Sequence, residues 1–171
     1  MNQIIRLSLL GLLLVLMQVF LANQMVLFET ATPYIFLLFL LFFPLTLPIP
    51  AQYVVGFGVG LLVDWLSLQG PVGLHAFCGT MLMALRPPLI TLIGSSAVST
   101  RGTGEIRLEK QQPLWYLTYF FPLLLIYISW YIFLEAMALT PFWLLAGKVV
   151  GTTTYTLLLC LILTYIFFRK S

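Results

Sequence analysis

The chain has 171 residues, of which 61% are hydrophobic and 8% are charged, whereas soluble globular domains carry roughly 25% charged residues. This composition excludes a water-soluble fold. The formal net charge of +3 does not point to a nucleic-acid partner, because Lys and Arg in loops also set the orientation of membrane proteins. A spanning helix takes about 20 apolar residues. We therefore predict one all-α integral membrane domain over residues 1–171, with six transmembrane helices and no separate soluble domain.

Two predicted helices occupy the first part of the chain. The first covers about Leu7 to Ala22, and we interpret it as a retained helix, not a cleaved signal peptide, because further apolar runs follow it. The second begins at Pro33, which suits a first turn because proline lacks only an N–H that has no partner there. Pro44, Pro48 and Pro50 are expected to end this second helix early.

The third predicted helix covers about Ala51 to Leu68, and a turn signal, Gln69-Gly70-Pro71, follows it. The fourth begins near Gly73 and then meets Arg86-Pro87-Pro88. Either this helix is kinked and continues to Ile93, or a short helix is followed by a segment that lies along the membrane interface. We favour the second, because an arginine at the membrane centre costs about 2.5 to 3.5 kcal/mol on insertion scales.

The last part of the chain contains a polar loop and two long helices. Ser95 to Gln112 is rich in Ser, Thr, Gly and mixed charges and is predicted to be a cytoplasmic loop. Helices are predicted from about Leu114 to Met137 and from about Pro141 to Phe168. With six spans, all basic residues but Lys148 fall on one side, and the positive-inside rule then places both termini in the cytoplasm. These residues are Arg6, Arg86, Arg101, Arg107, Lys110, Arg169 and Lys170.

Few residues offer catalytic or metal-binding chemistry. The chain has one histidine, His75, and five carboxylates, and no arrangement of a nucleophile with a base is visible. Its two cysteines lie in apolar runs without the spacing of metal ligands. We therefore predict no catalytic site, no cofactor and no metal. A lone histidine at a helix end is interpreted as hydrogen-bonded to backbone or water, with pH sensing as the alternative.

Two charged residues within apolar helices are more informative, because charges in hydrocarbon are usually paired or functional. Asp64 lies about four residues from the outer end of the third helix, and Lys148 lies about seven residues into the sixth. The two side chains are therefore at similar depth, within roughly one helical turn. We hypothesise a buried or half-buried ion pair between Asp64 and Lys148, with Glu135 as the competing partner of Lys148.

Each of these two helices also carries a GxxxG pattern, which lets helix backbones approach closely in lipid. Gly56 and Gly60 lie in the third helix, and Gly147 and Gly151 lie in the sixth. Direct contact between the two glycine faces would bring the charges together. The alternative is that each face packs against another neighbour, including a partner's helix.

The stretch from Gly56 to Leu85 (GFGVGLLVDWLSLQGPVGLHAFCGTMLMAL) resembles the core of the rod shape-determining protein MreD family. In that family a Gly-rich helix runs into a Leu-Leu-x-Asp element, a Gly-Pro-type turn and a Pro-x-Gly-Leu-(His or Tyr)-Ala start of the next helix. The match covers about 30 of the 171 residues. The matching positions are Gly60, Leu61, Leu62, Asp64, Pro71, Gly73, Leu74, His75 and Ala76.

The resemblance implies a non-enzymatic subunit of the bacterial cell-wall elongation complex in the inner membrane. Such a protein binds the single-span scaffold MreC and acts with MreB filaments, RodA and penicillin-binding protein 2. The resemblance also implies a fold similar to the S-components of vitamin transporters. The basic loop would contact filaments or anionic membrane lipid, although ordinary positive-inside topology is the simpler interpretation. The alternative function is a substrate-binding membrane component of a small-molecule (vitamin) transporter, suggested by the broken second helix and the buried charges.

Overall fold

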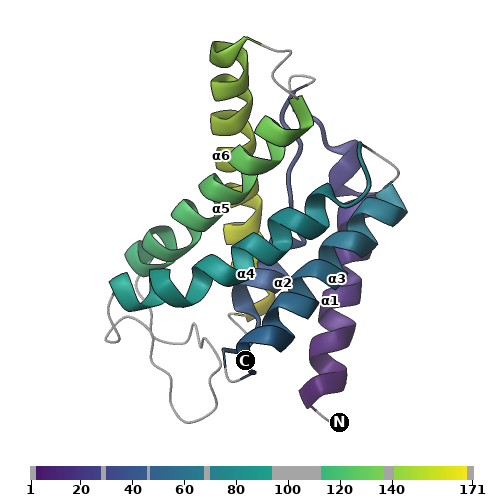
Figure 1. Cartoon of the computed structure of the whole chain (residues 1–171), viewed down its shortest axis with the longest axis vertical. Coiled ribbons are helices and arrows are strands. Elements are labelled where there is room, and N and C mark those ends of the chain that lie inside the picture. The colour runs from purple at the N-terminus through teal and green to yellow at the C-terminus, as the bar shows by residue number, and fades with distance from the viewer. Residues whose placement is uncertain are drawn as a thin grey trace.

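The computed structural model describes residues 3–27, 30–45, 47–67, 70–93, 113–136 and 141–168. Within these residues the regular elements are all helices, which confirms the predicted all-α class (Figure 1). The elements are α1 (Gln3–Phe20), the short 3₁₀ helix η1 (Ala22–Gln24), α2 (Leu37–Phe42), α3 (Ile49–Ser67), α4 (Leu74–Ile93), α5 (Pro113–Ala136) and α6 (Phe142–Phe168).

From α3 onward, each helix packs beside the one that follows it along the chain. In Figure 1, α4 lies between α3 and α5, and α6 packs against α5, while α1 packs against α3 and α2. The short α2 is almost completely enclosed by the longer helices, with exposed fractions of 0% to 5% over Leu37–Leu41. The core of the bundle is therefore built around this short element.

Four described helical stretches are long and apolar enough to cross a membrane. They cover Leu7–Gln24, Ile49–Ser67, Leu117–Ala136 and Phe142–Ile166. These correspond to the predicted first, third, fifth and sixth helices, whose observed ends lie within four residues of the predicted ones. Because α2 has only six residues and α4 carries an arginine and two prolines, neither qualifies by the same measure. The predicted count of six spans is thus confirmed for four helices only.

The second helix differs from its prediction. It begins at Leu37 and not at Pro33, and residues 31–36 form an irregular segment with a turn. Pro50, which we expected to end the second helix, lies instead in the first turn of α3, a position where proline loses no hydrogen bond.

The fourth helix also differs, because α4 continues through Pro87 and Pro88 to Ile93. The favoured prediction of a short helix that ends at Arg86-Pro87-Pro88 is therefore wrong, and the alternative of a helix that continues to Ile93 is the one observed. Arg86 has an exposed fraction of 0%. Its guanidinium group meets protein oxygen atoms, not lipid, which removes most of the cost that insertion scales assign to a lipid-facing arginine. Non-ideal backbone is tolerated at membrane depth where it is buried in protein.

The predicted orientation rests largely on groups that lie outside the described residues. The loop from Ser95 to Gln112 is among them, as are the C-terminal residues 169–171 and the side chain of Arg6. In Figure 1, α1 begins and α6 ends in the lower half of the view, whereas α5 ends and α6 begins in the upper half.

Candidate functional site

The connection between α3 and α4 is held by one carboxylate. Asp64 accepts hydrogen bonds from the backbone N–H groups of Gly73 (3.0 Å), His75 (3.2 Å) and Ala76 (3.1 Å). The first N–H groups of a helix have no partner within the helix, and the helix dipole favours a negative charge there. Asp64 therefore caps the N-terminus of α4 from the neighbouring helix.

Two glycines shape the same turn. Gly70 has φ of 83° and Gly73 has φ of 99°, a region that residues with a side chain rarely adopt. Between them the carbonyl of Pro71 accepts a hydrogen bond from the N–H of Leu74 (3.4 Å). This turn brings the N–H groups of α4 back over the end of α3, where Asp64 lies.

The glycines of α3 pack directly against the backbone of α4. A side chain at Gly60 would overlap the carbonyl oxygen of His75, and one at Gly56 would come within 2.7 Å of the carbonyl oxygen of Gly79. The GxxxG face of α3 is thus a close helix contact, but its partner is α4 and not α6.

The glycines of α6 have different surroundings. A side chain at Gly147 would meet no atom within 4 Å, and one at Gly151 would meet only Ala31, at 3.7 Å. The direct contact between the glycine faces of α3 and α6, which was one of two hypotheses from the sequence, is not formed.

The predicted ion pair between Asp64 and Lys148 is not formed either. Lys148 Nζ lies 2.9 Å from Glu135 Oε2, and both side chains are about one third exposed (35% and 33%). The competing partner considered from the sequence is therefore the one observed. Similar depth did not bring Asp64 to Lys148, because three backbone donors of α4 already occupy the Asp64 carboxylate.

His75 lies in a cluster of buried aromatic rings. Its Nδ1 is 2.7 Å from the hydroxyl oxygen of Tyr127, and its ring stacks on Tyr131 with a centroid distance of 4.2 Å. Tyr34 and Phe36 meet the imidazole edge-on, at 5.3 Å and 5.5 Å. The histidine is hydrogen-bonded as expected, but its partner is a tyrosine hydroxyl and not backbone or water.

The irregular segment before α2 has its backbone bonded by two side chains from other helices. Gln18 in α1 accepts hydrogen bonds from the N–H groups of Ile35 (2.6 Å) and Phe36 (3.4 Å) and donates one to the carbonyl of Pro33 (2.9 Å). The hydroxyl of Thr156 in α6 accepts a hydrogen bond from the N–H of Tyr34 (3.1 Å). These contacts satisfy buried backbone groups that neither helix nor solvent reaches.

The other end of α2 is held by Arg86. Its Nη2 donates to the carbonyl oxygens of Leu41 (3.0 Å) and Phe43 (2.6 Å), and its Nε donates to the hydroxyl of Tyr119 (2.9 Å). That hydroxyl in turn donates to the carbonyl of Leu41 (3.2 Å), and Nη1 donates to Met83 Sδ (3.3 Å). A cation at the C-terminal carbonyls of a helix is favourable.

The sequence did not predict most of the contacts that hold the two ends of this segment. Arg86 was singled out but was expected at the interface, and Gln18 and Thr156 were not considered. A usable signal was the isolated polar Gln18 within an apolar helix, because polar side chains in such helices commonly bond to neighbouring elements.

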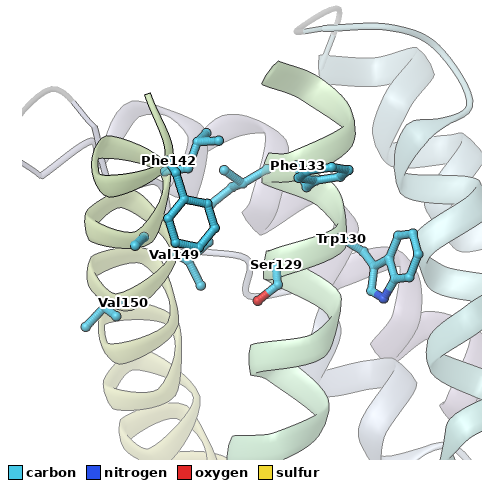
Figure 2. A pocket seen from close by; sticks show the side chains of 9 residues that line it. Ser129, Trp130, Phe133, Phe142, Val149 and Val150 are labelled. Atoms are coloured by element: carbon cyan, nitrogen blue, oxygen red, sulfur yellow. The ribbon is translucent and has the colours of Figure 1, made fainter. Parts of the chain in front are cut away.

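An apolar groove lies between α5 and α6 on the outside of the bundle. Figure 2 shows Trp130 and Phe133 on α5 and Phe142 and Val150 on α6, with Ser129 between them. Its volume is about 500 Å³. The Ser129 hydroxyl is already bonded to the carbonyl of Leu125 (2.6 Å). The lining residues are Ser129, Trp130, Ile132, Phe133, Phe142, Leu145, Ala146, Val149 and Val150.

Together these features define a helical membrane protein in which buried polar side chains hold an interrupted segment, residues 33–43, inside the bundle. Comparison with known proteins gives no closer assignment. No protein-family model, no curated protein and no solved structure matches the chain.

Proposed function

We propose that this protein is an integral membrane subunit of the bacterial cell-wall elongation complex, similar to the MreD family, and that it binds the single-span scaffold MreC and is needed for rod shape. The observation that carries the proposal is the α3–α4 connection. Gly60, Asp64, Gly73 and His75, which carry the sequence resemblance, all contribute to this one connection. Residues shared with a family are expected to lie together when they build a common structural element.

The same contacts favour an assembly role over catalysis. The Asp64 carboxylate accepts three backbone N–H groups, and the Arg86 guanidinium is bonded to two carbonyls and a tyrosine hydroxyl. Groups used in this way stabilise the bundle and are not available to a substrate without breaking it. The protein would then act through its membrane-facing surfaces.

The groove between α5 and α6 is the membrane-facing surface that we assign to the scaffold's helix. A partner that crosses the membrane once has only an apolar helix to offer within the bilayer. The groove supplies exposed aromatic side chains at Phe133 and Phe142, with exposed fractions of 58% and 82%, around the small Ala146. Packing of a helix over small residues is the usual basis of association in lipid, where apolar burial alone gives no advantage.

For the location, we propose the inner membrane with six crossings and both termini in the cytoplasm. In this arrangement α4 and the segment containing α2 cross with the four apolar helices, because buried polar side chains satisfy their irregular parts. MreB filaments, RodA and penicillin-binding protein 2 are the further partners that the resemblance implies.

Depletion of the protein in a rod-shaped bacterium that encodes it tests the proposal. We expect the cells to become spherical, to regain rod shape when the protein is restored, and to yield MreC as a co-purifying protein in mild detergent. Cells that keep their rod shape after full depletion would contradict the proposed function.

A pair of groove variants tests the binding surface separately. Ala146→Trp fills the groove, whereas Leu158→Trp, on the same helix outside the groove with an exposed fraction of 53%, is the matched control. We expect only Ala146→Trp to reduce recovery of MreC, at equal amounts of inserted protein. Equal recovery with both variants would exclude the groove as the binding surface while leaving the depletion result intact.

A transporter component is the second candidate function, and the interrupted segment is the observation in its favour, because interrupted helices hold substrates in several transporter folds. Here, however, the N–H of Ile35 and the carbonyl of Leu41 are bonded to side chains of the protein itself. A vitamin requirement in depleted cells of normal shape would favour this second function.

A further inference from the structure

The interrupted segment, residues 33–43, lies along α4 and touches it at three levels. At the first level, the rings of Tyr34 and Phe36 pack on His75. At the second, Leu40 Cδ1 lies 3.6 Å from the position that a side chain at Gly79 would take.

At the third level, the carbonyls of Leu41 and Phe43 accept hydrogen bonds from Arg86. His75 and Arg86 are eleven residues apart on α4, which corresponds to about 16 Å along the helix. One short segment therefore connects two buried polar clusters that do not touch each other in any described contact.

Both ends of the segment are held by specific hydrogen bonds, and its middle is buried. The Gln18 and Thr156 side chains hold the first end, and Arg86 holds the last. Between them the exposed fractions of Phe36 to Leu41 are 0% to 5%. Because a close-packed interior transmits a displacement and does not absorb it, a shift at one end has to move the other.

We propose that residues 33–43 couple the two clusters, so that release of the Arg86 end loosens the Tyr34–His75 end, and release of the Tyr34–His75 end loosens the Arg86 end. The coupling is reciprocal because it is a free energy between two sites. It gives the protein a means of passing a change at one depth of the membrane to another. This inference does not depend on the proposed function.

The chain contains its own reporter for the first cluster. Cys78 lies three residues after His75 and has an exposed fraction of 1%, so a maleimide reaches it only when the surrounding packing opens. In a Cys160→Ala background Cys78 is the single thiol of the chain. Its labelling rate in mild detergent then measures opening of the Tyr34–His75 end.

The perturbation is Tyr119→Phe, which removes only the hydroxyl that bonds to Arg86 and Leu41. We expect it to speed labelling of Cys78 by about tenfold. The reason is that Arg86 Nε loses an acceptor and the carbonyl of Leu41 loses a donor. Thr91→Ala is the matched control, because it removes an exposed hydroxyl on α4 that bonds to the carbonyl of Pro88 in the same helix. The control is expected to leave the Cys78 rate unchanged.

The reverse direction uses Leu41→Cys in a chain with both native cysteines replaced by alanine. Tyr34→Leu, which removes the ring packed on His75, is expected to speed labelling at position 41 by a similar factor. Size-exclusion retention and far-ultraviolet circular dichroism should match the unsubstituted protein in every variant. If Tyr119→Phe fails this criterion, Arg86→Lys takes its place.

Independent opening of the two clusters would overturn the proposed coupling. If Tyr119→Phe speeds labelling at Leu41→Cys while the Cys78 rate stays the same, the two clusters are independent. Equal acceleration of Cys78 by Thr91→Ala would likewise overturn it, because the effect would then not come from the segment.

Discussion

Replacement of Asp64 by alanine is the most informative single change, because this carboxylate holds three backbone donors at once. Its oxygens lie 3.0 to 3.2 Å from the N–H groups of Gly73, His75 and Ala76, and the side chain is 3% exposed. A buried donor left without a partner costs about 1 to 3 kcal/mol. The Gly73 contact is only partly buried, so we expect Asp64→Ala to lower the free energy of unfolding by about 3 kcal/mol.

Asp64→Asn separates the hydrogen bonds from the charge. Asparagine keeps one acceptor oxygen but loses the favourable interaction of a negative charge with the helix N-terminus, which contributes about 0.3 to 1 kcal/mol. It also loses the second acceptor. We therefore expect an intermediate loss of about 1 to 2 kcal/mol for Asp64→Asn.

The assay is reversible unfolding in mixed micelles with increasing sodium dodecyl sulfate, followed by circular dichroism. Trp65→Leu is the control, because Trp65 follows Asp64 in α3 but is 68% exposed. Unfolding free energies should fall in the order control, Asp64→Asn, Asp64→Ala. An alanine variant within about 0.5 kcal/mol of the control would refute the assignment of Asp64 as the cap. So would recovery of Asp64→Lys by Lys148→Asp, because that rescue requires the ion pair that the structure lacks.

The remaining predictions use the same assay. Gly60→Ala should destabilise the protein by about 1 to 3 kcal/mol, because a methyl group there overlaps the carbonyl of His75. Gly147→Ala, in open surroundings, should be neutral or stabilising by up to about 1 kcal/mol. Equal effects of the two substitutions would exclude the close α3–α4 contact. Glu135→Lys should cost only about 1 kcal/mol, since its ion pair is partly exposed, and adding Lys148→Glu should restore the loss. Absence of that restoration would count against the pair.

Hydropathy alone predicted the elements that the membrane requires. The helices α1, α3, α5 and α6 were expected within a few residues of their observed ends, because about 20 consecutive apolar residues have no other stable arrangement in hydrocarbon. The two helices without such an uninterrupted apolar run, α2 and α4, were mispredicted. In α2 and α4 the backbone or a charge needs a partner from elsewhere in the chain.

Arg86 shows why the local sequence was insufficient. Its cost in the membrane depends on whether its donors find acceptors, and those acceptors are the carbonyls of Leu41 and Phe43, which precede it by 45 and 43 residues. Nothing in the Arg86-Pro87-Pro88 sequence indicates them. We expected an interfacial position because insertion scales assign a high cost to an arginine at the membrane centre, whereas within the bundle its donors find acceptors on other elements.

Asp64 is the opposite case, in which the decisive partners were close in sequence and were overlooked. From its expected depth we paired Asp64 with Lys148, 84 residues away, although α4 begins only ten residues after Asp64. The first N–H groups of a helix need acceptors from outside the helix, because they have no partner within it. Lys148, in contrast, had Glu135 within reach on the neighbouring helix. In a membrane protein, the unpaired N–H groups at the start of a nearby helix are therefore more probable partners of a buried carboxylate than a distant lysine at similar depth.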